Sequence, residues 1–235
     1  WAARDAAALG LNLSVSPCFA DYQRALACWD TSLKGVPLSL DWDDVFPQSF
    51  APPSEASVLW ICNPHNPTGQ LWSRESLEPL LHQFELVICD EAFLSLVPDG
   101  EAQSLIPLVA AHPNLVVVRS LTKLFAIAGL RLGYAVAHPE RLNRWSAWRD
   151  PWPVNGLALA AADQLLGDPK SYWRWCTRVH HWVDREGVWL HQRLAELPHV
   201  IPMPSAANFC LIKGDASLVG LRERLERHHG VLLRD

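Results

Sequence analysis

Residues 115–134 read LVVVRSLTKLFAIAGLRLGY, and this stretch decides the fold. It opens with an apolar, valine-rich run that is too short for a helix, so it predicts a buried strand. Two hydroxyls and an amine follow that strand, on Ser120, Thr122 and Lys123. Open α/β sheets bind ligands at the carboxyl ends of their strands, where a partly desolvated amine near a guanidinium such as Arg131 can become a nucleophile. The alternative is a loop lysine that only solvates a strand end.

Two earlier apolar runs, at residues 58–62 and 86–89, predict further buried strands. Amphipathic stretches at 73–84 and 102–112 predict helices between these strands and the strand at 115–118. Alternation of strands and helices indicates a mostly parallel sheet with helices on both faces. The sequence therefore predicts an α/β fold.

Each of these three strands is followed by a polar side chain. The first leads into NPHNPTG at 63–69, where two Asn-Pro steps force turn geometry and direct Asn66 toward a ligand. The second ends at Asp90, and the third leads to Lys123. Because the strands are parallel, these side chains meet at one sheet edge and predict a site, with chance clustering as the alternative.

The rest of the chain predicts elements on both sides of this central part. Apolar residues recur with helical spacing from 168 to 197, which indicates one long amphipathic helix that bridges two domains. We expect a large domain at 1–167, this helix, and a small α+β domain at 198–235. The remaining predicted elements are helices at 2–9, 17–29, 139–148 and 216–229, an alanine-rich helix ending at 166, and strands at 11–15, 36–40, 134–137, 206–212 and 231–233.

Composition excludes several classes of function. A formal charge of −5 disfavours a nucleic-acid partner. The best candidate for a membrane span, residues 151–162, is too short and contains Asn155, and no signal pattern follows Trp1, so we expect a cytoplasmic protein. The six cysteines show no CxxC spacing and indicate reduced thiols; a disulfide or zinc site is the alternative, and no metal site is predicted.

Four motifs together resemble the fold-type I pyridoxal-phosphate enzymes, the aspartate aminotransferase superfamily. They are NPHNPTG (63–69), DEAF (90–93), SLTK (120–123) and GLRLGY (129–134). Within the superfamily they are similar to the branch that holds histidinol-phosphate aminotransferases and threonine-phosphate decarboxylases. The resemblance extends from about residue 17 to 209 and implies a large cofactor-binding domain followed by a small one.

The resemblance also implies a role for each matching residue, with pyridoxal 5′-phosphate as the cofactor. Lys123 would be the Schiff-base lysine, and Asp90 would pair with the pyridinium nitrogen and keep the ring electron-withdrawing. The remaining roles are Asn66 on the ring's phenolic oxygen and the substrate, Phe19 stacked on the ring face, and Ser120, Thr122 and Arg131 on the cofactor phosphate.

Two features favour a decarboxylase within this branch. Phe93 stands where many of its aminotransferases have a tyrosine, and PWPVN at 151–155 resembles a segment of threonine-phosphate decarboxylases in which Asn155 would contact substrate. The implied reaction converts L-threonine O-3-phosphate, a small phosphorylated amino acid, to aminopropanol phosphate for cobalamin biosynthesis. A histidinol-phosphate-type aminotransferase and a non-catalytic remnant are the alternatives.

The family pattern sets two further expectations for the whole protein. We expect a homodimer, as in the family. The family's glycine-rich phosphate loop would precede Trp1, and its carboxylate-binding arginine would follow Asp235, so we expect the chain to be a fragment.

Overall fold

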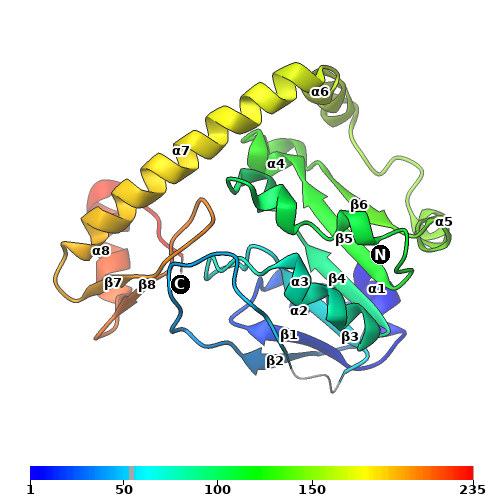
Figure 1. Cartoon of the computed structure of the whole chain (residues 1–235), viewed down its shortest axis with the longest axis horizontal. Helices are drawn as coiled ribbons and strands as arrows, with labels where there is room; N and C mark the ends of the chain where they lie inside the picture. The colour runs from blue at the N-terminus through cyan, green and yellow to red at the C-terminus, as the bar shows by residue number, and fades with distance from the viewer. Residues whose placement is uncertain (53–55, 235) are drawn as a thin grey trace.

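The computed structural model describes residues 1–52 and 56–234, and its centre is a six-stranded sheet in the order β2-β1-β3-β4-β5-β6 (Figure 1). Neighbouring strands are parallel except β5 and β6, which are antiparallel. The predicted mostly parallel α/β sheet is therefore confirmed. Its strands are β1 (Asn12–Ser16), β2 (Leu33–Pro37), β3 (Val58–Cys62), β4 (Leu86–Asp90), β5 (Leu115–Ser120) and β6 (Gly133–Ala137).

Both faces of this sheet are buried, which explains the unbroken apolar runs of β3, β4 and β5. Successive strand residues point to opposite faces. Val58 and Trp60 of β3 accordingly enter one apolar cluster, whereas Leu59 and Ile61 enter the other. The same alternation in β4 and β5 gives the sheet two separate cores.

Different helices cover the two faces. Tyr22 and Leu26 of α2 (Asp21–Ala27) pack on the Trp60 side, together with α1 (Ala2–Ala7) and α5 (Pro139–Trp148). The Ile61 side is covered by α3 (Arg74–Leu77) and the 3₁₀ helix η1 (Glu78–His82), through side chains that include Leu77, Leu80 and Leu81. Pro79 at the start of η1 coincides with the break between these two helices, which were predicted as one helix at 73–84.

The helix predicted at 102–112 is wrong. Two short 3₁₀ helices stand in its place, η3 (Gly100–Gln103) and η4 (Ile106–Leu108). Between them the backbone N–H of Leu105 donates to Glu91 Oε1 at 2.7 Å, and Pro107 has no N–H to give. The hydrogen bond to Glu91 replaces the internal bond that a continuous helix needs.

The C-terminal part contains a small second sheet. Strand β7 (Val200–Pro202), which the sequence analysis missed, pairs antiparallel with β8 (Ile212–Gly214), so the strand predicted at 206–212 is wrong over most of its length. Ser205 Oγ instead donates to the carbonyl of Phe209 at 2.6 Å and closes a local turn. The strand predicted at 36–40 lies earlier, as β2.

The strand predicted at 231–233 is also wrong. Helix α8 (Val219–His229) ends at Gly230, which has a left-handed backbone, and residues 231–234 form no strand. Glycine in this conformation stops a helix and turns the chain away. Other helical elements are η2 (Leu94–Leu96), α4 (Leu121–Leu124), η5 (Ala128–Leu130), α6 (Gly156–Leu166) and α7 (Pro169–Ala195).

Helix α7 runs from α6, near the large sheet, to α8 and the small sheet (Figure 1). Asp168 caps its start by accepting hydrogen bonds from the backbone N–H groups of Lys170 and Ser171, both at 3.1 Å. Among residues 1–52 and 56–234, no helix combines the length and apolar character that crossing a membrane requires.

A close contact joins the small sheet region to the large one at Gly69. Its φ is +78°, and a Cβ at this position would lie 2.7 Å from Cβ of Ser205. The backbone N–H of Ala206 donates to the carbonyl of Gly69 at 2.9 Å. Only glycine combines this backbone conformation with this approach.

We expect Gly69→Ala to lower the free energy of unfolding by about 1–3 kcal/mol, because alanine adds both backbone strain and a clash with Ser205. Urea denaturation measures the change. Gly220→Ala in α8, where a Cβ meets nothing within 4 Å, is the control and should be neutral or slightly stabilising. Equal losses in the two variants would contradict the role given to the Ser205 contact.

Candidate active site

Asp90 is a half-buried carboxylate at the end of β4. Its Oδ2 accepts a 2.7 Å hydrogen bond from the Tyr22 hydroxyl, and its Oδ1 accepts one from the Ala92 N–H at 3.0 Å. Burial raises the pKa of Asp90, while these two donors and the charge of Lys123 oppose that shift. The structure therefore brings the predicted acid and the predicted amine into electrostatic contact.

Lys123 lies in α4, one turn beyond the end of β5. Its Nζ is 5.0 Å from the centroid of the Phe93 ring, a distance at which a cation is attracted to a ring face. Phe93 packs edge-on against Phe209 at 5.0 Å. The side chain of Lys123 is exposed, so its amine is accessible at the sheet edge.

The predicted phosphate-binding residues are only partly brought together. Ser120 Oγ and Thr122 Oγ1 are hydrogen-bonded at 2.7 Å, so two hydroxyls lie side by side. Arg131 follows η5 in a left-handed conformation, and its Nη1 donates to the carbonyl of Ala128 at 2.9 Å. The Arg131 guanidinium is exposed, so its other N–H groups are accessible to a ligand. Its role in binding a phosphate stays a prediction.

Asn66, Phe19 and Asn155 occupy three different parts of the structure. Asn66 is half-buried on the turn after β3, and the half-buried ring of Phe19 packs edge-on against Tyr22 at 5.6 Å. Asn155 caps α6 by accepting a hydrogen bond from the Ala158 N–H at 2.9 Å, and its Nδ2 donates to the carbonyl of Leu130 at 3.1 Å. Asn155 thus joins α6 to the GLRLGY segment, and its contact with substrate stays a prediction.

A buried ion network lies directly behind the site. Arg119 Nε donates to Glu91 Oε2 at 2.8 Å, and its Nη1 and Nη2 donate to the two oxygens of Glu101 at 2.7 and 2.9 Å. Ser104 Oγ donates to Glu91 Oε2 at 2.8 Å and accepts from Arg119. Glu91 adjoins Asp90 and Arg119 adjoins Ser120, so the network fixes the two strand ends that carry the site.

Neither this network nor Tyr22 was predicted from the sequence. One usable signal was present: Asp90 pairs with Val118, so the opposite charges of Glu91 and Arg119 face each other one residue further along. For Tyr22 the signal was its place three residues after Phe19, one turn along the same helix start.

His65 is a buried side chain within the NPHNPTG turn and stabilises it. Its side chain is 1 % exposed, its Nδ1 is 2.7 Å from Thr68 Oγ1, and its ring lies 5.1 Å from Trp72. Burial lowers the pKa of His65 to about 4, and the backbone of Pro17 opposes this shift in part. The imidazole is therefore a neutral structural group.

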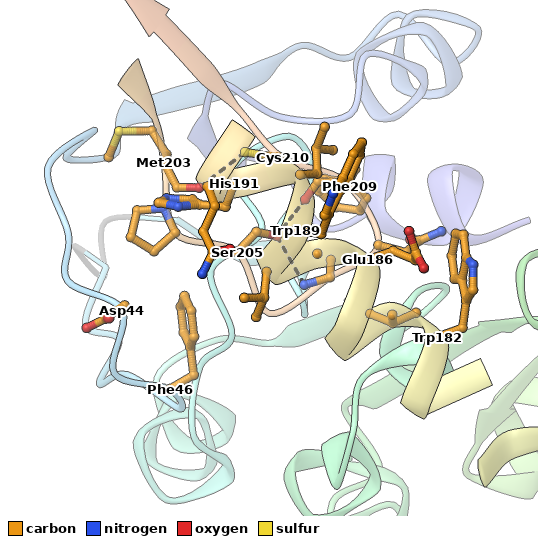
Figure 2. A pocket seen from close by; sticks show the side chains of 18 residues that line it. Asp44, Phe46, Trp182, Glu186, Trp189, His191, Met203, Ser205, Phe209 and Cys210 are labelled. Atoms are coloured by element: carbon orange, nitrogen blue, oxygen red, sulfur yellow. Dashed lines mark hydrogen bonds between the residues drawn. The ribbon is translucent and has the colours of Figure 1, made fainter. Parts of the chain in front are cut away.

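An apolar groove of about 570 Å³ opens beside Phe209 (Figure 2). Trp182 and Trp189 of α7 lie on one side of it, and Met203 and Ser205 lie on the loop that faces them. Phe209, which lines the groove, packs against Phe93, the ring that Lys123 Nζ faces. The six cysteines are free thiols; Cys62 and Cys89 are buried, whereas Cys210, in the run that predicted a buried strand at 206–212, is half-buried.

Comparison with known proteins decides the family. The family model described as aminotransferase class I and II matches residues 13–235. The chain belongs to this family. Threonine-phosphate decarboxylase of Salmonella typhimurium is 34 % identical over 220 residues, which are 90 % of this chain and 58 % of that protein. Histidinol-phosphate aminotransferase 1 of Nitrosococcus oceani is 30 % identical over 226 residues, 92 % of this chain and 58 % of that protein.

Solved structures agree with this family. L-threonine-O-3-phosphate decarboxylase from Porphyromonas gingivalis superposes with a TM-score of 0.80 at 27 % identity, covering 99 % of this chain and 69 % of that one. Histidinol-phosphate aminotransferase from Sinorhizobium meliloti, solved with pyridoxal-5′-phosphate, gives 0.81 at 21 % identity, covering 95 % and 61 %. The chain spans about 60 % of the length of its curated relatives.

The cofactor of this aminotransferase family is pyridoxal 5′-phosphate, and the side chains at the sheet edge fit it. Asp90 could serve a ring nitrogen with its half-buried carboxylate, and Lys123 could serve an aldehyde with its accessible amine. The hydroxyls of Ser120 and Thr122 could serve a phosphate. This donor set matches the three polar parts of the cofactor.

We expect Arg119→Ala to lower the free energy of unfolding by about 3–5 kcal/mol, because it leaves the fully buried Glu91 carboxylate without its cation. Arg24→Ala breaks an exposed pair with Asp21 and should cost about 1 kcal/mol or less. Urea denaturation at pH 7 compares the two. A loss for Arg119→Ala no larger than the control's would show that the network does not hold the strand ends.

The buried imidazole of His65 predicts a pH dependence of stability. The pKa of His65 is about 4 in the folded chain and 6.5 when unfolded, so between these values only the unfolded chain binds the proton. The free energy of unfolding should therefore fall as pH falls, by about 3 kcal/mol from pH 7 to 4 for this group. His65→Gln should remove this contribution, as urea denaturation at each pH will measure. Parallel curves for the two proteins would contradict the assignment.

Proposed function

We propose that the protein decarboxylates L-threonine O-3-phosphate to aminopropanol phosphate, in the biosynthesis of cobalamin. The observation that carries the proposal is the setting of Lys123: its amine faces the hydroxyl-free Phe93 ring and interacts with the half-buried carboxylate of Asp90. The likeness of PWPVN at 151–155 to threonine-phosphate decarboxylases supports it further. Relatives of both names match with similar identity, so identity alone does not choose the reaction.

Each side chain then has a task in the proposed reaction. Bound pyridoxal phosphate would accept the electron pair left at Cα when the bond to CO₂ breaks. Asp90, whose charged form Tyr22, Ala92 and Lys123 favour, would hold a proton on the ring nitrogen. Lys123 would supply Nζ as the covalent attachment point and would return a proton to Cα once CO₂ has left.

The remaining side chains would position and shield these atoms. Ser120, Thr122 and Arg131 would hold the cofactor phosphate, and Asn66 and Phe19 would fix the ring's edge and face. Phe93 and Phe209 form an apolar wall beside Lys123 that limits the access of water. Bond choice depends on which substituent of Cα stands perpendicular to the ring, so contacts to the substrate, including the one proposed for Asn155, would select loss of CO₂.

The second candidate is amino transfer from histidinol phosphate. It is favoured by the histidinol-phosphate aminotransferases among the relatives, which cover the same part of the chain. The same lysine and aspartate would serve it, but with the Cα–H bond aligned for cleavage in place of the C–CO₂ bond.

A homodimer is part of the proposal. Large apolar side chains at the start of α6 and along α7 support it: Trp152 is 88 % exposed, Leu157 76 % and Trp173 58 %. Single soluble chains rarely expose so much apolar surface in one region.

The decisive experiment incubates the complete protein and pyridoxal phosphate with threonine phosphate, and separately with histidinol phosphate plus 2-oxoglutarate. We expect CO₂ from the first mixture, no glutamate from the second, and a loss of at least about 1,000-fold in rate for Lys123→Ala, because the attachment point and proton donor are gone. Glutamate from the second mixture without CO₂ from the first would overturn the decarboxylase. Failure of borohydride to fix cofactor on Lys123 would favour a non-catalytic remnant.

A further inference from the structure

The Tyr22 hydroxyl is the one side-chain hydrogen-bond donor that the described residues place on Asp90. Its 2.7 Å hydrogen bond reaches Oδ2, while the backbone of Ala92 serves Oδ1. Tyr22 is 7 % exposed, and Asp90 is half-buried at the end of β4.

Two aromatic rings fix the position of Tyr22. Trp60 lies 5.3 Å away with a 32° tilt, and Phe19 packs edge-on at 5.6 Å. The Trp60 indole N–H in turn donates to Asn12 Oδ1 at 2.7 Å, which locks the indole. The phenol is thus held in one orientation by packing, before any cofactor binds.

Strand alternation explains why this contact can form. Val58, Trp60 and Cys62 project to the α2 side of the sheet, as do Leu86, Ile88 and Asp90. Tyr22 of α2 packs on this side in the same cluster as Trp60 and Ile88. Asp90 is therefore the polar end of a row whose other members are apolar, and Tyr22 is the residue that meets it there.

We propose that Tyr22 is a positioning residue that keeps the Asp90 carboxylate ionised and aimed at the ring nitrogen of the cofactor. This inference rests on the proposed role of Asp90 and extends it to a residue that no sequence motif singled out. Burial raises the pKa of Tyr22, so the phenol remains a donor across the working pH range. The other ionisable groups around Asp90 are Cys62 on β3, Lys123 on α4, and Cys89 and Glu91, which flank Asp90 in the sequence.

The test measures cofactor affinity rather than turnover. Pyridoxal phosphate is titrated into the complete protein between pH 8.5 and 5.5 and followed by absorbance. For Tyr22→Phe we expect the dissociation constant to rise about ten-fold at pH 8.5, the effect of losing a hydrogen bond to a charged group. The gap to the wild type should widen toward pH 5.5, because without the phenol the carboxylate of the cofactor-free protein takes up a proton at higher pH.

Tyr172→Phe is the matched control. Tyr172 lies on α7 with its ring 6.2 Å from Phe125, and its hydroxyl interacts with Cys176 rather than with Asp90, so its variant should bind cofactor like the wild type at each pH. A Tyr22→Phe gap that is absent, or the same at every pH, would overturn the proposal, since lost packing alone does not depend on the charge of Asp90.

Asp90→Asn separates this proposal from the one on which it rests. If Asp90→Asn binds cofactor as tightly as the wild type, the role of Asp90 is wrong and the role of Tyr22 is wrong with it. If Asp90→Asn weakens binding and Tyr22→Phe does so with the pH dependence above, both stand. If only Asp90→Asn weakens binding, Tyr22 alone is refuted.

Discussion

One buried ion pair, Arg119 with Glu91, holds together the strand ends on which the site is built. A guanidinium and a carboxylate are costly to remove from water, and they are tolerated here because Ser104, Glu101 and the Leu105 N–H satisfy their remaining hydrogen-bonding capacity. The pair crosses from β4 to β5 one residue beyond their last paired positions. It thereby ties the end of the strand that carries Asp90 to the end of the strand that leads to Lys123.

Strand alternation assigns the charges to two different tasks. Asp90 and Glu91 are adjacent in sequence, yet they point to opposite faces of the sheet. Asp90 accepts a hydrogen bond from Tyr22, whereas Glu91 accepts hydrogen bonds from Arg119 and the Leu105 N–H. The two neighbouring carboxylates therefore differ in function because side chains alternate between the two faces of the sheet. A one-residue shift in the register of β4 would exchange their positions.

Elements of this fold that depend on residues close together in the sequence could be predicted, whereas those that depend on contacts between distant residues could not. Buried parallel strands could be predicted because apolar runs are local, and Asp90 and Lys123 because polar residues after such runs share one edge. The segment at 102–112 could not, because Glu91 takes the Leu105 N–H from outside it. Tyr22 and Asp90 are 68 residues apart and meet only after folding. Arg131 is positioned by a hydrogen bond to the carbonyl of Ala128, and Asn155 by one to the carbonyl of Leu130. No pattern in the sequence predicts these backbone contacts.

The glycine at position 69 joins two parts of the molecule that the sequence separates by more than a hundred residues. Its carbonyl holds Ala206, and its N–H is held by the carbonyl of His65, next to Asn66. Phe209 on the same loop packs edge-on against Phe93, the ring that Lys123 Nζ faces. The loop at 205–209 therefore contacts the large domain at two points, the turn that carries Asn66 and the Phe93 ring beside Lys123. A movement of the small sheet would be transmitted to the site through both contacts.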